Sequence, residues 1–296
     1  MSHSGTASTL LRGLFDDASL FPPAAMPMSD ALDGHVRHQT AWYRELSGAF
    51  VCPESRLTQL RAALTAVNLA EIDLSLIVTG GAAGVAEAVD AVAIDPRLRL
   101  RSVEVPAGLG PATRQDRAAA AQPVAEVAAA LDAVPLAGAA GYVEIPLTAL
   151  GDDVLAPIEA HRYRAKLRTG GQTAAAFPDE AALAACLVAL ADRRLPFKCT
   201  AGLHHAVRHT AADTGFEHHG FLNLLLAVTA AADGAAAEDV AAVLADRDGG
   251  QVAAQIAGLD LQDAGRARDL VTSIGSCSTD EPVADLVALG LLSEAG

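Results

Sequence analysis

Residues 164–202 read RAKLRTGGQTAAAFPDEAALAACLVALADRRLPFKCTAG. Two short apolar runs, Arg164–Arg168 and Phe197–Thr200, flank a stretch rich in alanine and leucine, Asp179–Arg193. A strand-like run, a longer helix-like run and a second strand-like run together indicate a βαβ unit. We therefore predict two parallel strands joined by a helix in this part of the chain.

The same alternation continues on both sides of this unit. Eight strand-like runs separated by helix-like stretches close most naturally into an α/β fold of the (β/α)₈ or TIM barrel type, with its active site at the C-terminal ends of the strands. A doubly wound open sheet gives the same local pattern and remains the alternative. The six further strand candidates are Leu14–Asp16, Ala49–Cys52, Ile72–Thr79, Leu98–Val105, Gly141–Ile145 and Val271–Cys277. Further helix candidates are Glu54–Ala66, Ala82–Val92, Pro123–Ala133 and Pro282–Leu289.

One connection is much longer than the others. Between Gly202 and Asp269 the chain holds two helix candidates, Phe221–Ala232 and Ala235–Leu244. An excess of this kind after a barrel strand would lie over the mouth of the barrel. We therefore predict one barrel domain over residues 1–296, with a long helical insertion between strands 7 and 8 in which residues 203–269 form a lid or an oligomer contact. The stretch Ala107–Gln122 is expected to be a shorter loop of the same kind.

Composition excludes several classes of function. The formal net charge of −15 would repel phosphodiester backbones and anionic membranes, so we expect neither a nucleic acid nor a membrane as partner. The four cysteines show no CxxC spacing, which favours reduced, buried thiols. The N-terminal sequence MSHSGTASTLLRGLF lacks the pattern of a secretory signal. These features predict a cytoplasmic enzyme, and we expect it to be a homo-oligomer.

Lys166 and Lys198 lie inside two strand candidates that follow one another. Burial disfavours the charged form of a lysine, and a second cation nearby lowers its pKa further. A neutral amine attacks carbonyl carbons, so two lysines that point into a barrel from adjacent strands suit Schiff-base chemistry. The alternative is that each lysine reaches the strand end or pairs with a carboxylate.

The two lysine motifs, KLRTG and KCTAG, resemble those of deoxyribose-phosphate aldolase and its class I aldolase relatives, in which one strand carries Lys-x-Ser-Thr-Gly and the next carries Lys-x-Ser-Gly-Gly. Short fragments elsewhere resemble the same family in the same order along the chain. They are LFDDASLFPP at 14–23, AFVCP at 49–53, RSVEVP at 101–106 and SIGSCS at 273–278.

The resemblance implies catalytic roles for four residues. Lys166 would be the Schiff-base lysine, Lys198 the cation that lowers its pKa, Glu104 the acid/base carboxylate, and Asp16 a supporting polar group. Glu104 replaces an aspartate of the family, which makes its reach one methylene longer. The resemblance thus predicts a class I aldolase-like lyase that needs no cofactor and no metal and acts on a small-molecule carbonyl substrate.

The sequence departs from the family where phosphate would be held. Arg168 replaces a small residue, and Leu203-His204-His205 replaces an Ile-Arg pair, which puts a phosphorylated substrate in doubt. The loop IGSCST at 274–279 leads into a helix expected to begin between Thr279 and Pro282, and its N–H groups predict a shallow anion site. The candidate substrate-binding residues are Arg168, Thr169, His204, His205, Glu144, Gly275, Ser276 and Ser278.

Histidines gather after the seventh strand candidate. Neutral imidazoles together with Glu217 could bind zinc or iron, although their spacing matches no established metal motif. The alternative function is therefore a metal-dependent hydrolase or lyase that uses the His204–His219 loop. A third alternative is a barrel that has lost catalysis and serves as a binding protein, but this leaves the buried lysines unexplained.

Overall fold

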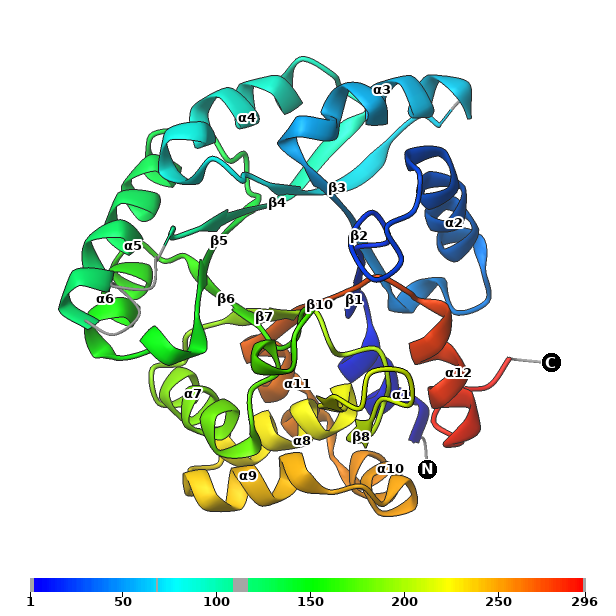
Figure 1. Ribbon diagram of the computed structural model, residues 1–296. Coiled ribbons are helices and arrows are strands. Elements are labelled where there is room, and N and C mark those ends of the chain that lie inside the picture. The colour runs from blue at the N-terminus through cyan, green and yellow to red at the C-terminus, as the bar shows by residue number, and fades with distance from the viewer. Residues whose placement is uncertain (1–2, 68, 109–116, 295–296) are drawn as a thin grey trace.

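The computed structural model describes residues 3–67, 69–108 and 117–294. Eight parallel strands close into a barrel, in which β10 pairs with both β7 and β1 to complete the ring (Figure 1). The closed ring confirms the predicted TIM-barrel fold and excludes the open sheet. The barrel strands are β1 (Phe15–Asp17), β2 (Ser47–Pro53), β3 (Ile72–Ile77), β4 (Leu98–Pro106), β5 (Ala140–Ile145), β6 (Arg164–Arg168), β7 (Phe197–Thr200) and β10 (Val271–Ser276).

Helices surround the barrel and connect successive strands (Figure 1). They are α1 (His3–Leu11), α2 (Met28–Thr40), α3 (Leu57–Ala66), α4 (Val85–Ala93), α5 (Arg117–Asp132), α6 (Asp152–Ala160), α7 (Glu180–Asp192), α8 (Phe221–Ala232), α9 (Ala237–Ala245), α10 (Gly249–Gly258), α11 (Leu261–Leu270) and α12 (Asp280–Ala288). Short 3-10 turns cover Arg44–Leu46, Glu54–Arg56, Gly81–Gly84, Leu147–Ala149 and Ala174–Ala176.

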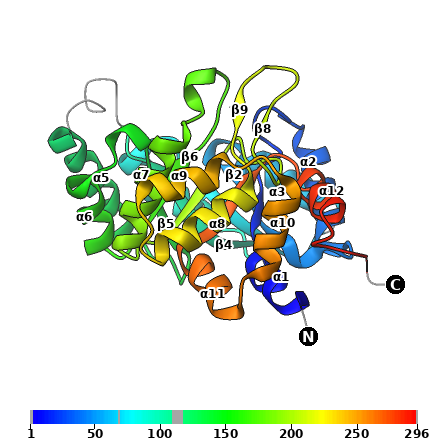
Figure 2. The same ribbon diagram turned by 90° about the horizontal axis from the view of Figure 1, so that it is seen from below.

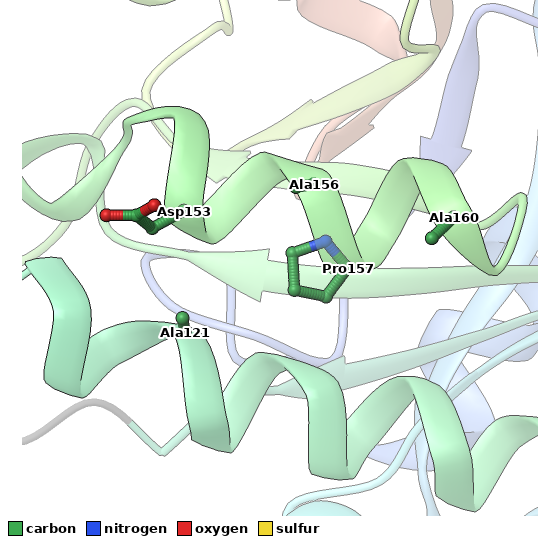
Figure 3. Close-up of a pocket in the computed structure, with 5 residues that line it drawn as sticks. All are labelled: Ala121, Asp153, Ala156, Pro157 and Ala160. Atoms are coloured by element: carbon green, nitrogen blue, oxygen red, sulfur yellow. The ribbon is translucent and has the colours of Figure 1, made fainter.

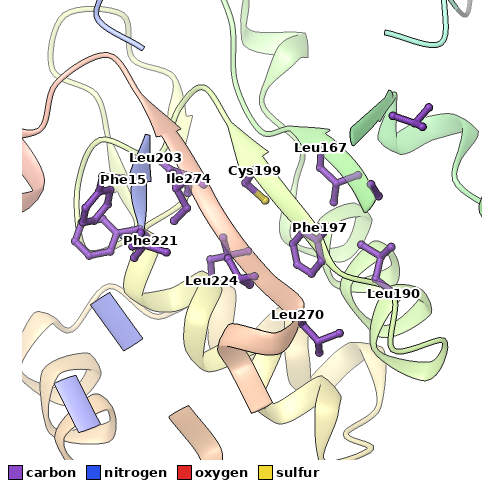
Figure 4. Packing of buried hydrophobic residues seen from close by; sticks show 14 of the residues in the cluster. Phe15, Leu167, Leu190, Phe197, Cys199, Leu203, Phe221, Leu224, Leu270 and Ile274 are labelled. Carbon is purple, nitrogen blue, oxygen red and sulfur yellow. The ribbon is translucent and has the colours of Figure 1, made fainter. Parts of the chain in front are cut away.

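The alternation of side chains along each strand separates two environments. Outward-facing apolar residues such as Leu167, Phe197 and Ile274 are fully buried and pack against the surrounding helices (Figure 4). Phe15 of β1 meets Phe221 of α8 edge to face, with ring centroids 5.1 Å apart. The intervening positions point into the barrel, and several of them carry polar or charged groups.

The connection between β7 and β10 is the long helical insertion that the sequence predicts. It contains a small antiparallel hairpin, β8 (His209–Thr210) and β9 (Glu217–His218), followed by the four helices α8 to α11. The hairpin rises at the same end of the barrel as the loop after β6, whereas α1 lies at the opposite end (Figure 2). The insertion therefore contributes both to the mouth of the barrel and to its outer layer.

One detail differs from the sequence expectation. The expected loop Ala107–Gln122 is shorter, because α5 already begins at Arg117 and continues through Pro123, while residues 109–116 lie outside the described residues.

The segment Ala174–Asp192 is long and apolar enough by composition to be considered for a membrane span, a weak indication that core helices share. In the structure this segment is broken into a 3-10 turn and α7, and α7 buries Leu183, Leu187 and other apolar residues.

Candidate active site

A cavity of about 730 Å³ opens at the C-terminal ends of the barrel strands. Its floor is formed by Glu104, Lys166 and Lys198, and its rim comes from the loops that follow β1, β6 and β7. This is the end of a TIM barrel at which catalytic residues are found, because loops from several strands converge there. The cavity therefore agrees in location with the active site predicted from the sequence.

Strand register brings the two lysines side by side. Lys166 of β6 is the direct partner of Lys198 of β7, and Glu144 of β5 is the partner of Lys166. All three positions point inward. The side chains of Lys166 and Lys198 are 2% and 1% exposed, so their amines are almost completely removed from solvent.

Glu104 joins the two lysines. Its Oε2 lies 2.6 Å from Lys166 Nζ, and its Oε1 lies 2.7 Å from Lys198 Nζ. Ser75 of β3 donates its hydroxyl proton to the same Oε1, and Ser102 contacts Ser75 at 2.6 Å. A single carboxylate thus bridges both amines, which keeps them inside the distance of about 10 Å over which charges interact strongly at moderate salt.

Asp16 holds the far side of Lys198. Its Oδ2 lies 2.5 Å from Lys198 Nζ and accepts a hydrogen bond from the Ser273 hydroxyl at 2.6 Å. Its Oδ1 accepts a hydrogen bond from the backbone N–H of Ala49 at 2.9 Å. Since every oxygen of Asp16 is engaged, the carboxylate is fixed in one orientation.

Glu144 completes the surroundings of Lys166. Its Oε2 lies 2.9 Å from Lys166 Nζ, and its Oε1 lies 3.2 Å from the Arg168 guanidinium at the mouth of the cavity. Each carboxylate that contacts Lys166 therefore also contacts a second cation. The result is a chain of alternating charges through the barrel: Asp16, Lys198, Glu104, Lys166, Glu144 and Arg168.

The charge states of this chain follow from its pairing. Burial would raise the pKa of Glu104, but the ammonium groups of Lys166 and Lys198 outweigh burial and hold that pKa well below its usual range. Burial would lower the pKa of Lys198, but the carboxylates of Asp16 and Glu104 outweigh it, so the pKa of Lys198 is raised. The net pKa of Lys198 therefore lies above its ordinary value and not below it, and Lys198 is a cation at neutral pH, the charge state that the resemblance implies for it.

Some of the candidate substrate-binding residues line the cavity and others do not. Arg168, His204 and Gly275 line it. Glu144 acts on the cavity through Lys166 and Arg168 instead. Thr169 is fully buried in the turn after β6, where its hydroxyl donates to the carbonyl oxygen of Ala201 at 2.7 Å.

In the loop before α12, polar groups form hydrogen bonds with one another. The Ser276 hydroxyl donates to the carbonyl oxygen of Ser278 at 2.6 Å, and the Ser278 hydroxyl oxygen accepts from the backbone N–H of Glu281 at 3.3 Å. Asp280 and Glu281 occupy the first turn of α12. These internal bonds and acidic side chains compete with an anion at the site that the sequence predicts there.

The histidines after β7 divide into separate contacts. His204 Nδ1 lies 3.2 Å from Glu281, and His205 Nδ1 lies 3.1 Å from Asp285. His219 is buried and contacts the carbonyl oxygen of Pro178 at 2.8 Å, while His209 packs between the rings of His205 and His218. Within residues 3–67, 69–108 and 117–294, no three His, Cys, Asp or Glu side chains converge on a point that could hold a metal ion. The metal-dependent alternative therefore gains no support from this part of the chain.

All four cysteines are unpaired, as the sequence predicts, and all four are buried, which the sequence predicts for Cys52, Cys199 and Cys277. Cys277 lines the cavity, and its sulfur lies 3.5 Å from His204 Nδ1. Burial raises the pKa of the Cys277 thiol to about 11, and it raises those of Cys52 and Cys186 to about 12. These side chains are protonated thiols at neutral pH rather than nucleophiles.

A second cavity, of about 580 Å³, lies on the outer face between α5 and α6 (Figure 3). Its lining consists of Asp153 together with small apolar side chains, among them Ala121 and Pro157. A single carboxylate among alanines offers no pair of groups for acid/base or nucleophilic chemistry, so this cavity is not a candidate active site.

Sequence reasoning missed two features of the site. The inward serines Ser75, Ser102 and Ser273 could have been found as polar residues inside apolar strands. The small number of lysines points more strongly to the site. Lys166 and Lys198 are the only lysines among the 296 residues, and every other basic side chain of the Lys/Arg type is an arginine. Arginine cannot lose its proton under physiological conditions, whereas lysine can, so this chain keeps its two ionisable amines for the interior of the barrel.

Comparison with models of known protein families found no match, and comparison with curated protein sequences also found none. The resemblance to class I aldolases therefore depends on the motifs, and the structure supports it at the level of the barrel fold.

Proposed function

We propose that this protein is an aldolase-like lyase in which Lys166 forms a Schiff base with a small aldehyde, ketone or keto acid, and a carbon–carbon bond is made or broken. One observation carries the proposal. The two lysines of the chain are register partners on adjacent strands, both line one cavity, and a single buried carboxylate joins them.

Lys166 suits the role of nucleophile better than Lys198. Both carboxylates around Lys198 hold it as a cation, with oxygens at 2.5 and 2.7 Å, and the face of the Tyr142 ring lies 5.5 Å away. The carboxylates around Lys166 are each shared with another cation, either Lys198 or Arg168. Removing the proton from Lys166 therefore leaves both of those carboxylates with a partner.

The chemistry follows in balanced steps. The Lys166 proton passes transiently to Glu104, whose Oε2 is 2.6 Å away; the step is uphill because the neighbouring ammonium groups keep the pKa of this carboxyl low. The free amine then attacks the carbonyl carbon of the substrate. The carbonyl oxygen takes up the proton held by Glu104 and one proton from the attacking nitrogen and leaves as water, which gives the iminium. Glu104 takes a proton from the neighbouring carbon to give an enamine, which attacks a second carbonyl carbon, and the oxygen of that carbonyl group then takes up the same proton. Hydrolysis then releases the product and restores the amine, without any oxidant or reductant.

Reductive trapping tests the proposal. Borohydride in the presence of acetaldehyde, acetone or pyruvate should add one substrate-derived mass to the intact protein, and the adduct should map to the peptide that contains Lys166. Nonspecific labelling has few sites here, because the chain offers only Lys166, Lys198 and its terminal amine. Lys166→Met should abolish the adduct, whereas Arg99→Met, an exposed cation outside the cavity, should leave it unchanged.

Lys198→Met provides the second arm. Without the Lys198 charge, Glu104 interacts with Lys166 alone and favours the ammonium form, so trapping should weaken at pH 7 and recover at higher pH. An adduct on Lys198 that survives Lys166→Met would exchange the two roles but leave the mechanism intact. The absence of an adduct across a broad panel of carbonyl compounds, together with activity that follows added metal, would contradict the proposal.

A further inference from the structure

Three rings form one wall of the cavity. Phe177 comes from the segment between β6 and α7, and Phe216 and His218 come from the hairpin after β7, which rises at the same end of the barrel (Figure 2). The Phe177 and His218 rings are stacked with centroids 4.3 Å apart, and the Phe177 and Phe216 centroids are 5.6 Å apart. We call these three residues the aromatic wall.

The aromatic wall lies directly beyond the two lysine strands. The Phe177 ring packs on the turns that follow β6 and β7, since a Cβ added to Gly170 or Gly202 would lie only 2.9 or 3.0 Å from its Cε1 atom. Gly202 also has a φ of +77°, which favours glycine. A ring thus occupies the place beside these glycine turns at which a phosphate could otherwise approach the backbone.

The aromatic wall is held in place from behind. Arg208, which is buried at the base of the hairpin, forms an ion pair with Glu180 of α7 at 2.6 Å and contacts His219 at 3.1 Å. The backbone N–H of Arg208 donates to the Asn223 side chain of α8 at 2.9 Å. A wall fixed in this way needs little reorganisation when a ligand binds.

The charges around the cavity disfavour a phosphate. Each of the three cations that the described lining contributes, Lys166, Arg168 and Lys198, is already paired with a carboxylate. Burial lowers the pKa of both lining histidines, that of His218 to about 4 with help from nearby histidines, so neither adds a positive charge at pH 7. Asp213 on the hairpin adds a negative one.

We propose that the cavity takes an uncharged carbonyl compound with an aromatic substituent, whose carbonyl carbon meets Lys166 while its ring packs against Phe177, Phe216 and His218. The position of the carbonyl group depends on the proposed Schiff-base function, whereas the ring site does not. A volume of about 730 Å³ is within the range of small-molecule pockets, and aromatic rings are the surface that such a ring packs against best.

Trapping with three aldehydes tests the substrate class. The concentration that gives half-maximal adduct should be roughly tenfold lower for phenylacetaldehyde than for acetaldehyde. The half-maximal concentration of glyceraldehyde 3-phosphate should be higher than that of phenylacetaldehyde. Phe216→Ala should raise the half-maximal concentration of phenylacetaldehyde about two- to tenfold and that of acetaldehyde by a smaller factor. Trp42→Ala removes an aromatic side chain outside the cavity and should leave the half-maximal concentrations of both aldehydes unchanged. The same half-maximal concentration for both uncharged aldehydes, or preference for the phosphate, would overturn the proposal.

A second measurement separates the ring site from the Schiff base. Benzyl alcohol cannot form an imine, so its binding to Lys166→Met, followed by calorimetry, reports the aromatic wall alone. Binding that weakens when Phe216→Ala is added would support the ring site even if no aldehyde is ever trapped. Adducts on Lys166 with all three aldehydes, together with no binding of benzyl alcohol, would leave the Schiff-base function standing and overturn the aromatic substrate.

Discussion

Removing Lys198 should destabilise the protein more than removing Lys166. Lys198→Met leaves Asp16 and Glu104 in the barrel without the ammonium that lies 2.5 and 2.7 Å from their oxygens. Glu104 keeps Lys166 as a partner, whereas Asp16 loses its ion-pair partner and keeps hydrogen bonds from the Ser273 hydroxyl and the Ala49 N–H. Breaking a buried ion pair by removing one partner costs about 3–5 kcal/mol, and we expect a loss of that size at pH 7.

A double-variant cycle shows whether the loss comes from the stranded carboxylate. Asp16→Asn removes the charge but keeps an oxygen for the Ala49 N–H, so the pair Lys198→Met and Asp16→Asn should be more stable than additivity predicts by about 1–3 kcal/mol. Urea unfolding provides the free energies, with the slope checked for constancy. A loss below about 1 kcal/mol for Lys198→Met, or strict additivity in the cycle, would refute the reasoning.

The pH dependence of the unfolding free energy tests the same ion pairs independently. The lysine ammonium groups hold the pKa of Glu104 below its ordinary value against the opposing effect of burial. Ionised Glu104 therefore contributes stability above about pH 4 that is lost as the pH falls. Lys198→Met has already lost part of this contribution, so its deficit in unfolding free energy relative to the wild type should shrink as the pH falls below about 4. A deficit that grows on acidification would contradict this assignment.

Three further outcomes are expected. Lys166→Met should lower the unfolding free energy less than Lys198→Met does, because both carboxylates around Lys166 keep another cation; urea midpoints measured side by side decide this. Burial and neighbouring histidines lower the pKa of His218 to about 4, so the unfolded chain binds an extra proton between about pH 4 and pH 6.5 and stability should rise with pH across that window. His218→Asn should flatten that rise in unfolding curves, and an unchanged slope would contradict it. The Cys277 thiol, whose pKa burial raises to about 11, should resist iodoacetamide at pH 7.5 in the folded protein and react after denaturation, as mass spectrometry would show; rapid modification of the folded protein would be the opposite result.

The strands could be predicted from the sequence because buried parallel strands are short and apolar. Arg164–Arg168 and Phe197–Thr200 were predicted with the bounds that the structure has, and α8 was as well. The named helix candidates did not include α2, whose composition is polar on average, or α6, which contains Pro157. Proline normally ends a helix in sequence reasoning, and only tertiary packing shows where it is tolerated.

The two lysines could be predicted because they lie inside apolar strands, and the resemblance implied Glu104 and Asp16; the structure brings the four side chains together. Their partners could not be predicted. Whether Glu144 contacts Lys166, and whether Thr169 faces the cavity or the turn, depends on strand register and side-chain direction. The aromatic wall could not be predicted either, because Phe177 and Phe216 lie in loops and are 39 residues apart in the sequence.

The alternating charges around Lys166 stabilise the iminium as well as the ammonium form of the resting enzyme. An ammonium at Lys166 and an iminium on the same nitrogen both carry one positive charge, whereas the free amine between them carries none. Glu104 and Glu144 lie 2.6 and 2.9 Å from this nitrogen, and the bonds that fix them in the barrel are already made before the substrate arrives. Charges oriented in advance in a site shielded from water stabilise a developing charge without further reorganisation. Two carboxylates at this nitrogen therefore do not argue against a nucleophilic lysine. They raise the cost of the transient neutral amine and lower that of the iminium. Glu104 therefore accepts the Lys166 proton first and, once it has passed that proton to the substrate oxygen, stabilises the covalent intermediate together with Glu144.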